Sequence, residues 1–311
     1  MERQDAFSSC HPAVNFIFFA LVLLFSMCLM HPACLAASMA GGCAYAACLR
    51  RREAGRFGLV FVLPTALAAA LLNPLFNHEG ATILAWLPWG NPLTLESVIY
   101  GLAAAAMLAC VLIWFSCFHE VVQSDKLVWL FGRLLPSLSL VLSMALRFVP
   151  RFTGQMKKTA EVQRLQGLDV GRGGVWQRSR AAFAILSAML TWSFENAVET
   201  ADSMRSRGYG LKGRTSFSIY RMSRRDWVLL CWMLFCAACL LWGWTAGLLS
   251  FRYFPTVKGG ASPCSLCLVL LYLALCLTPV LCRGVQSAVW ARRAARGCAT
   301  RGGTEGEPWT V

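Results

Sequence analysis

The chain has 311 residues, of which 57% are hydrophobic and only 14% are charged, and its formal net charge is +14. Soluble domains usually contain about 25% charged residues, and several runs here reach the roughly 17–25 apolar residues that a membrane-spanning helix needs. The composition excludes an ordinary soluble protein, and we predict an all-α polytopic membrane protein.

Six apolar runs are the predicted membrane spans. The four clearest runs are residues 14–30, 98–118, 227–249 and 265–282. The runs at 33–49 and 57–72 are rich in Ala and Gly. We expect these two to be buried among other helices, because small residues let backbones approach closely in lipid. The first run has no convincing cleavage site and further spans follow it, so we expect it to be retained rather than removed as a signal peptide.

Two His-Pro pairs bracket the first run, His11-Pro12 and His31-Pro32. Proline is tolerated in the first turn of a helix, where its missing N–H would have had no partner. Both pairs therefore predict helix starts. The alternative is that the two histidines bind a metal ion.

Lys and Arg are unevenly distributed along the chain. Residues 73–97 contain none and residues 251–262 contain two, whereas basic residues follow the second run, fill much of 119–226 and follow the last run. Excess Lys and Arg mark the cytoplasmic loops of membrane proteins. We therefore expect both termini and residues 119–226 on the cytoplasmic side, and the two basic-poor segments outside. This topology and anionic lipid account for the positive charge without nucleic acid.

The chain is expected to have three parts. Residues 1–118 form an N-terminal transmembrane module, residues 119–226 form a basic, largely helical region at the cytoplasmic interface, and residues 227–311 hold two further spans and a tail. The tail, residues 296–311, is polar and rich in glycine, so we expect it to be disordered.

Residues 119–226 are predicted to contain about two amphipathic cytoplasmic helices. Pro136 should kink or split the apolar segment before them, and Pro150 should end that segment. The first helix is predicted over residues 155–168 and the second from about Trp176 to Arg207. Residues 181–192 of the second helix are apolar enough to lie against lipid or the spans.

The second half of the longer helix has one continuous apolar stripe. Its members follow the i, i+3, i+4, i+7 and i+10 spacing of one helix face, and they are Phe194, Ala197, Val198, Ala201 and Met204. We expect this apolar stripe to be covered, either by the first helix or by a partner subunit.

Three carboxylates, Glu195, Glu199 and Asp202, lie on a different face of the same helix. They could ligate a metal ion, exchange protons or form a solvated, ion-paired row. Metal–carboxylate sites in helical bundles usually include histidine, and no histidine follows His119. We therefore expect the solvated, ion-paired row.

Other motifs of catalysis or cofactor binding are weak or missing in the sequence. Cys264-Ser-Leu-Cys267 has the spacing of a redox or zinc motif, but no second cysteine pair or nearby histidine completes a four-ligand set. The G-x-x-x-x-G-K-[ST] spacing of a phosphate-binding loop is absent as well. We predict no catalytic, metal or cofactor site, and any ATP would be bound by another chain.

Both predicted cytoplasmic helices end at a glycine beside arginine: Arg164 precedes Gly167, and Ser206 and Arg207 precede Gly208. Glycine is the preferred residue for a left-handed helix cap, and a basic residue near the C-terminus favours the helix dipole. Two ordinary helix ends are therefore one interpretation. The arginines could also bind carboxylates on a partner or lipid phosphates.

These motifs resemble those of the transmembrane T component of energy-coupling factor transporters, a family with two Ala-Arg-Gly-type motifs at the ends of two coupling helices. Residues 206–210, Ser-Arg-Gly-Tyr-Gly, match the second motif, with Ser206 in place of alanine. The first motif departs more, because Gln166 stands where the family has arginine and Arg164 lies two residues earlier. The similarity also includes residues 11–15, 91–93, 143–150 and 218–221.

The resemblance implies a membrane scaffold without an active site, in an importer of vitamins, other micronutrients or metal ions. Two cytoplasmic ABC-type ATPase subunits would bind the coupling-helix ends, and a small membrane subunit that binds the substrate would lie against the apolar stripe. The location would be a bacterial or archaeal cell membrane. An integral membrane enzyme acting on lipids at the cytoplasmic interface is the alternative, although the sequence has no clustered His, Asp and Glu residues for it.

Overall fold

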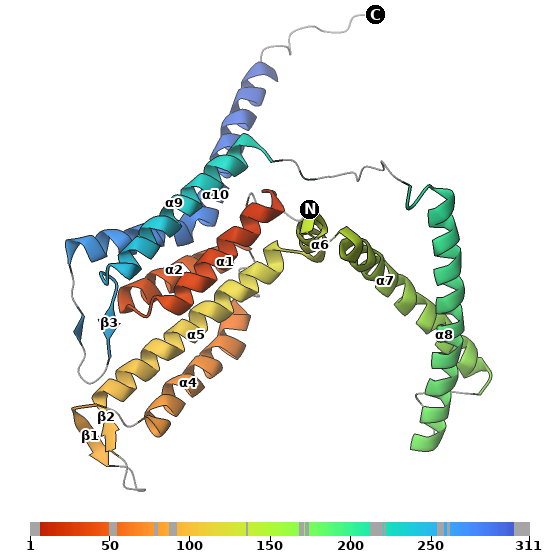
Figure 1. The fold of residues 1–311 in the computed structure, drawn as a ribbon, viewed down its shortest axis with the longest axis horizontal. Helices are drawn as coiled ribbons and strands as arrows, with labels where there is room; N and C mark the ends of the chain where they lie inside the picture. Colours follow the sequence, from red (N-terminus) through yellow and green to blue (C-terminus); the bar gives the residue numbers. More distant parts are fainter. Residues whose placement is uncertain are drawn as a thin grey trace, which may run out of the picture. The chain divides into compact units, whose positions relative to one another are not determined.

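The computed structural model describes residues 7–49, 55–77, 80–86, 92–134, 136–167, 171, 174–211, 220, 222–253, 258–259 and 262–301. The chain divides into two compact units, Met1–Ser124 with Tyr220–Val311, and Asp125–Ile219, and each is described by itself. Figure 1 shows that the described residues are almost entirely helical, with two short hairpins. The predicted all-α fold is confirmed.

The first unit is a bundle of apolar helices. Its helices are α1 (Pro12–Cys28), α2 (Pro32–Leu49), the π-helix η1 (Gly58–Val62), α4 (Leu63–Phe76), α5 (Leu95–Val121), α9 (Arg224–Thr245) and α10 (Pro263–Arg301). Two antiparallel hairpins pair β1 (Ile83–Trp86) with β2 (Pro92–Thr94) and β3 (Phe251–Arg252) with β4 (Lys258–Gly259). The second unit holds α6 (Ser124–Leu134), α7 (Pro136–Leu165) and α8 (Val175–Ser206).

Both His-Pro pairs start helices, as predicted. The Nδ1 atom of His11 accepts the N–H of Ala13 at 3.3 Å, and that of His31 accepts the N–H of Ala33 at the same distance. Each histidine thus satisfies one of the open donors of a helix N-terminus, where the proline has none to offer.

The core of the first unit is aromatic and lies between α1, α2 and α5. Phe18 and Phe19 of α1 are fully buried and meet the ring of Trp114 edge to face, with centroids 5.8 and 6.3 Å apart. Tyr45 of α2 stacks on the same tryptophan at 6.4 Å. Edge-to-face and offset contacts are the arrangements that aromatic rings favour, so these rings fix how the three helices pack.

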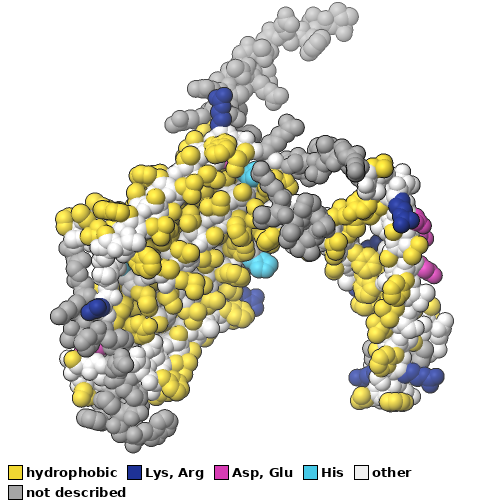
Figure 2. All heavy atoms as spheres, viewed as in Figure 1, with side chains coloured by type: hydrophobic (Ala, Val, Ile, Leu, Met, Phe, Trp, Pro, Cys, Tyr) yellow, Lys and Arg dark blue, Asp and Glu magenta, His cyan; other side chains and the backbone are white. Residues whose placement is uncertain are grey.

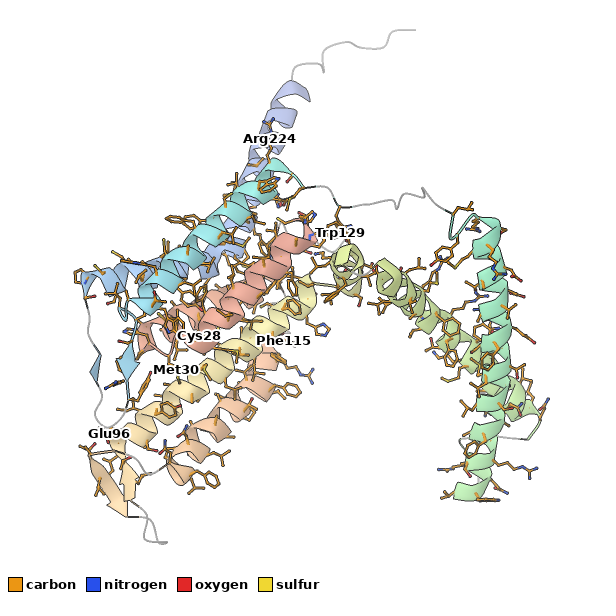
Figure 3. All side chains as sticks on the ribbon, viewed as in Figure 1. Cys28, Met30, Glu96, Phe115, Trp129 and Arg224 are labelled. Atoms are coloured by element: carbon orange, nitrogen blue, oxygen red, sulfur yellow. The ribbon has the colours of Figure 1, made fainter. Side chains whose placement is uncertain are left out.

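The two hairpins lie at the same end of this bundle. Tyr253, just after β3, donates its hydroxyl hydrogen to the carbonyl of Met30 at 2.6 Å and packs against Tyr100 of α5. At the start of α5, the carboxylate of Glu96 accepts hydrogen bonds from the backbone and the hydroxyl of Thr82 at 3.2 and 2.7 Å. Figure 3 labels Met30 and Glu96 at this end. The turn between α1 and α2 and both hairpins are therefore tied together.

Residues 57–72 are not buried among helices, contrary to expectation. Leu59, Phe61 and Leu67 of this segment are exposed, and Figure 2 shows the wide hydrophobic surface of the unit. The side that packs carries Val62 and several small residues, and a Cβ placed on Gly101 of α5 would lie 3.0 Å from the carbonyl oxygen of Ala70. The small residues allow one close helix contact, and the leucine face remains available to lipid.

Six helical segments of the described chain are long and apolar enough to cross a membrane: α2, Gly55–Phe76, α5, α8, α9 and Pro263–Val289. The number agrees with the prediction, but the membership differs. The first predicted span is α1, which has only 17 residues. That is about 26 Å of helix, slightly less than the roughly 30 Å thickness of a bilayer core. In place of α1, α8 is long and apolar enough to cross a membrane, because its residues 181–192 are apolar.

In the second unit, one of the two proline predictions is confirmed and one is wrong. Pro136 begins α7 after α6 ends, but α7 continues through Pro150. An interior proline removes a backbone hydrogen bond and costs about 3 kcal/mol. Phe148 and Phe152, on either side of Pro150, both pack on Trp192 of α8. This packing holds both halves of α7 against α8, and the local backbone rule could not include it.

The end of the chain also differs from expectation. Residues 296–301 belong to α10, which runs to Arg301, whereas we expected disorder from residue 296. Residues 302–311 of the predicted tail lie outside the described residues, as does most of the motif at residues 218–221.

Candidate functional site

The C-terminus of α8 is built around Gly208, whose φ of +75° is a conformation that L side chains rarely adopt. Its N–H donates to the carbonyl of Arg205 at 2.9 Å, and the N–H of Tyr209 donates to that of Met204 at 3.0 Å. These two bonds form a Schellman motif, which satisfies carbonyls that a helix end would otherwise leave open. The left-handed cap predicted at Gly208 is confirmed.

Arg207 is the C-cap residue of α8, and its side chain is exposed. The hydroxyl of Ser206 instead donates back to the carbonyl of Ser203 at 2.9 Å. The guanidinium is thus presented outward at the negative end of the helix dipole, as is that of the neighbouring Arg205. Its planar fork of N–H donors matches a carboxylate or phosphate in two parallel hydrogen bonds.

The C-terminus of α7 has the same backbone design. Gly167 has a φ of +86°, and its N–H donates to the carbonyl of Arg164 at 3.1 Å. Leu165, the last helical residue, is 85% exposed, and Arg164 is also exposed. A second glycine-capped helix end therefore carries an arginine at the surface. The residues after Gly167 that belong to this motif, Leu168 and Asp169, lie outside the described part.

Matching the two caps residue by residue shows which positions correspond. Gly167 corresponds to Gly208, and Arg164 corresponds to Arg205, because each of these arginines accepts the same hydrogen bond from the capping glycine. The counterpart of Arg207 is therefore Gln166. The sequence placed Gln166 at the family's arginine position, and the backbone geometry agrees. Arg164 projects from the helix two residues before the cap.

The two helix ends are far apart in the second unit. α7 and α8 pack against each other in opposite directions, and Figure 1 shows the C-terminus of α8 well away from the C-terminus of α7. Arg164 and Gly167 thus form one candidate contact, while Ser206, Arg207 and Gly208 form another. The structure does not bring the two sets together, which suits two separate contacts rather than one pocket.

A cluster that the sequence reading missed joins the two helices. Trp192 of α8 stacks on Phe148 of α7 at 5.7 Å and 22°, and lies 6.4 Å from Phe152. The guanidinium carbon of Arg151 is 5.7 Å from the centroid of the same tryptophan. We call these four residues the aromatic node. The i, i+4 spacing of the two phenylalanines was a usable signal, but the expected helix end at Pro150 concealed it.

The apolar stripe of α8 is not covered by α7. Phe194 is 71% exposed and Val198 62% exposed. Ala197 and Ala201 are exposed too, and Met204 is half-buried. The face that packs on α7 instead carries Ala181 and Met189, which are buried. Of the two covers expected from the sequence, the first helix is therefore excluded among the described residues of this unit.

The three carboxylates of α8 are also exposed, and Figure 2 shows acidic side chains gathered on this helix. Among the described residues there is no group of three or more His, Cys, Asp and Glu side chains that could hold a metal ion. Cys264 and Cys267 are exposed free thiols at the start of α10. At the opposite end of the bundle, Cys10 is buried and accepts a hydrogen bond from Arg225 at 2.9 Å; burial raises the pKa of this thiol.

Apolar helices of spanning length and two helix ends, each capped by glycine and bearing an exposed arginine, define a multi-pass membrane protein with two separate candidate contact sites. The chain belongs to the CbiQ family of cobalt transport proteins, whose model matches residues 10–219. The matched region includes both candidate helix ends.

Individual relatives carry a related name. The energy-coupling factor transporter transmembrane protein EcfT of Lacticaseibacillus paracasei is 42% identical over 105 residues, which are 33% of this chain and 40% of that protein. EcfT 1 of Listeria monocytogenes is 35% identical over 116 residues, or 37% of this chain and 41% of the relative. EcfT of Listeria innocua is 29% identical over 187 residues, which are 55% of this chain and 69% of that protein. The chain thus spans about two-fifths of the length of the first two relatives.

Proposed function

We propose that this protein is the membrane-embedded scaffold of an ATP-driven importer of the energy-coupling factor type. In this role it transmits movement of ATPase subunits to a membrane subunit that binds the substrate, and it catalyses no reaction itself. The observation that carries the proposal is the pair of glycine-capped helix ends, each with an exposed arginine, in a chain without a phosphate-binding loop. The family match argues against the alternative of a lipid-modifying enzyme.

The partners in this proposal are two cytoplasmic ABC-type ATPase subunits and one small membrane subunit. Arg207 donates a bidentate, charge-assisted hydrogen bond to a carboxylate of one ATPase, and Arg164 does so at the other. The exposed apolar stripe lies against the substrate-binding subunit, because an apolar face of a helix on the cytoplasmic side is normally buried against another element. The bilayer surrounds the first unit.

Both termini and the second unit lie on the cytoplasmic side in this proposal. The basic residues of 119–226 favour that side. Two segments poor in basic residues, 73–97 and 251–262, contain the two hairpins, which lie at one end of the first unit (Figure 1), as a shared outer location requires. Labelling from outside should therefore reach Asn77 and not Gly171. Access to Gly171 from outside would overturn the orientation and the function together.

The substrate class is a vitamin, a related micronutrient or a metal ion. The family description names cobalt transport and the relatives are energy-coupling factor proteins. Substrate choice belongs to the substrate-binding subunit, since no metal-ligating cluster is present in the described residues of this chain.

The test is reconstitution. The complex purified from native membranes should contain two ABC-type ATPases and a small membrane protein in fixed ratio, and in liposomes it should accumulate substrate only with ATP. Arg207→Glu should abolish ATPase association, because losing one partner of a buried charge pair costs about 2–5 kcal/mol. The variant should still insert. If Arg205→Glu destroys association and Arg207→Glu does not, the assigned contact is wrong. If neither matters, the arginines serve lipid.

A further inference from the structure

The aromatic node lies along α7 and α8 between the two candidate helix ends, Arg164–Gly167 and Ser206–Gly208. About 20 Å of helix separates Trp192 from Ser206, and a similar length separates Phe152 from Leu165, at 1.5 Å per residue. From Arg207 toward the start of α8, the residues down to Ala197 are exposed, apart from the half-buried Met204. The end of α8 is therefore a long arm without lateral support from α7.

Packing between the helices begins where this arm ends. Asn196 is buried, Trp192 packs on Phe148 of α7, and Met189 is 2% exposed beside the hydroxyl of Thr159 at 3.6 Å. Ala181 is fully buried further along the same face. A displacement of the Arg207 end therefore first reaches packed positions at Asn196 and the aromatic node, before it passes further along this pair of helices.

The shape of the node suits the transfer of force. Phe148 and Phe152 lie one helical turn apart and hold the indole of Trp192 from two directions, at interplanar angles of 22° and 49°. The two phenylalanine rings are 5.6 Å apart, and Arg151 adds a cation–π contact. Aromatic contacts restrict relative orientation more than aliphatic contacts do, so α8 cannot roll or slide on α7 without breaking them.

We propose that Trp192, held by Phe148 and Phe152, is the positioning residue that couples the two helix ends, so that movement imposed at Arg207 turns α7 and α8 as one body. This inference rests on the proposed function. Without the node, the arm of α8 would bend or slide on α7, and ATP hydrolysis would continue without moving the substrate-binding subunit.

The experiment compares uptake with ATP hydrolysis in the reconstituted complex. Trp192→Leu keeps an apolar side chain but removes the ring. We expect uptake per ATP hydrolysed to fall about tenfold, the scale of losing two aromatic contacts. Hydrolysis and subunit ratio should remain within about twofold of the wild type. Trp192→Phe should restore most of the coupling because a ring remains. Trp176→Leu is the matched control, since Trp176 lies on the same helix and is 84% exposed.

Each outcome decides between the two ideas. A wild-type complex that lacks ATPases or uptake overturns the proposed function. A functional wild type with an unchanged ratio of uptake to hydrolysis in Trp192→Leu overturns the inference, as does an equal loss in Trp176→Leu. If Trp192→Leu fails to assemble, Phe152→Leu decides the question: this milder variant removes one ring contact and must also lower uptake per ATP, and a wild-type ratio there overturns the inference.

Discussion

Replacing Gly208 with alanine perturbs the end of α8 at one point. At φ +75° a Cβ crowds the following carbonyl, which costs roughly 1–2 kcal/mol, and it would also lie 3.2 Å from Cδ1 of Leu211. The chain must accept this strain or open the two cap bonds to Arg205 and Met204. A cost of this size should make opening of the cap about 5- to 30-fold more frequent.

Hydrogen exchange measured on the purified protein reads this opening at the amides of positions 208 and 209. Gly154→Ala is the matched control: Gly154 lies inside α7, its φ is not positive, and a Cβ there meets no atom within 4 Å. That substitution should stabilise the helix by roughly 0.5–1 kcal/mol, so the two identical chemical changes should have opposite effects. If Gly208→Ala leaves both amides as protected as before while Gly154→Ala slows exchange in α7, the left-handed cap does not hold the end of α8.

Two further predictions concern other surfaces. Val198→Asp should weaken recovery of the substrate-binding subunit with the complex, because an unpaired charge would enter an apolar contact; unchanged recovery would mean that the stripe faces elsewhere. Burial lowers the pKa of His31 below its ordinary value near 6.5. The folded protein therefore favours the neutral ring, and stability should fall as pH drops from about 6.5 through the lowered pKa. His31→Asn caps the helix without titrating, so a melting temperature equally pH-dependent in this variant would contradict the role of His31.

Local rules predicted the parts of the site that depend on a few neighbouring residues. Gly208 and Gly167 each follow a helix and need a left-handed backbone, and the structure has both in that conformation. The starts of α1 and α2 could be predicted equally well, because a His-Pro pair supplies a side-chain acceptor and a residue that lacks an N–H. In these places the determining contacts lie within about five residues of each other.

Contacts between distant residues account for what the sequence did not reveal. Pro150 lies inside α7 because Trp192, far along the chain, packs on both of its flanks. We expected either the first helix or a partner subunit to cover the apolar stripe. Periodicity alone could not show that a different face of α8, the one with Met189, packs on α7. Periodicity shows that a helix has an apolar face, and only the packed structure shows which element lies against it.

The buried polar side chains of the first unit have a consequence for how its helices find one another. Ser26 of α1 lies 2.8 Å from the hydroxyl of Ser38 in α2 and 3.0 Å from that of Tyr272 in α10. The indole N–H of Trp114 in α5 donates to Ser38 at 3.0 Å. Lipid tails are as apolar as leucine, so hydrophobicity alone does not select one rotation of a helix about its axis in a bilayer. Hydrogen bonds are directional, and these three are satisfied together at one rotational setting of four helices. A few small hydroxyls thus supply angular information that the many surrounding apolar residues lack.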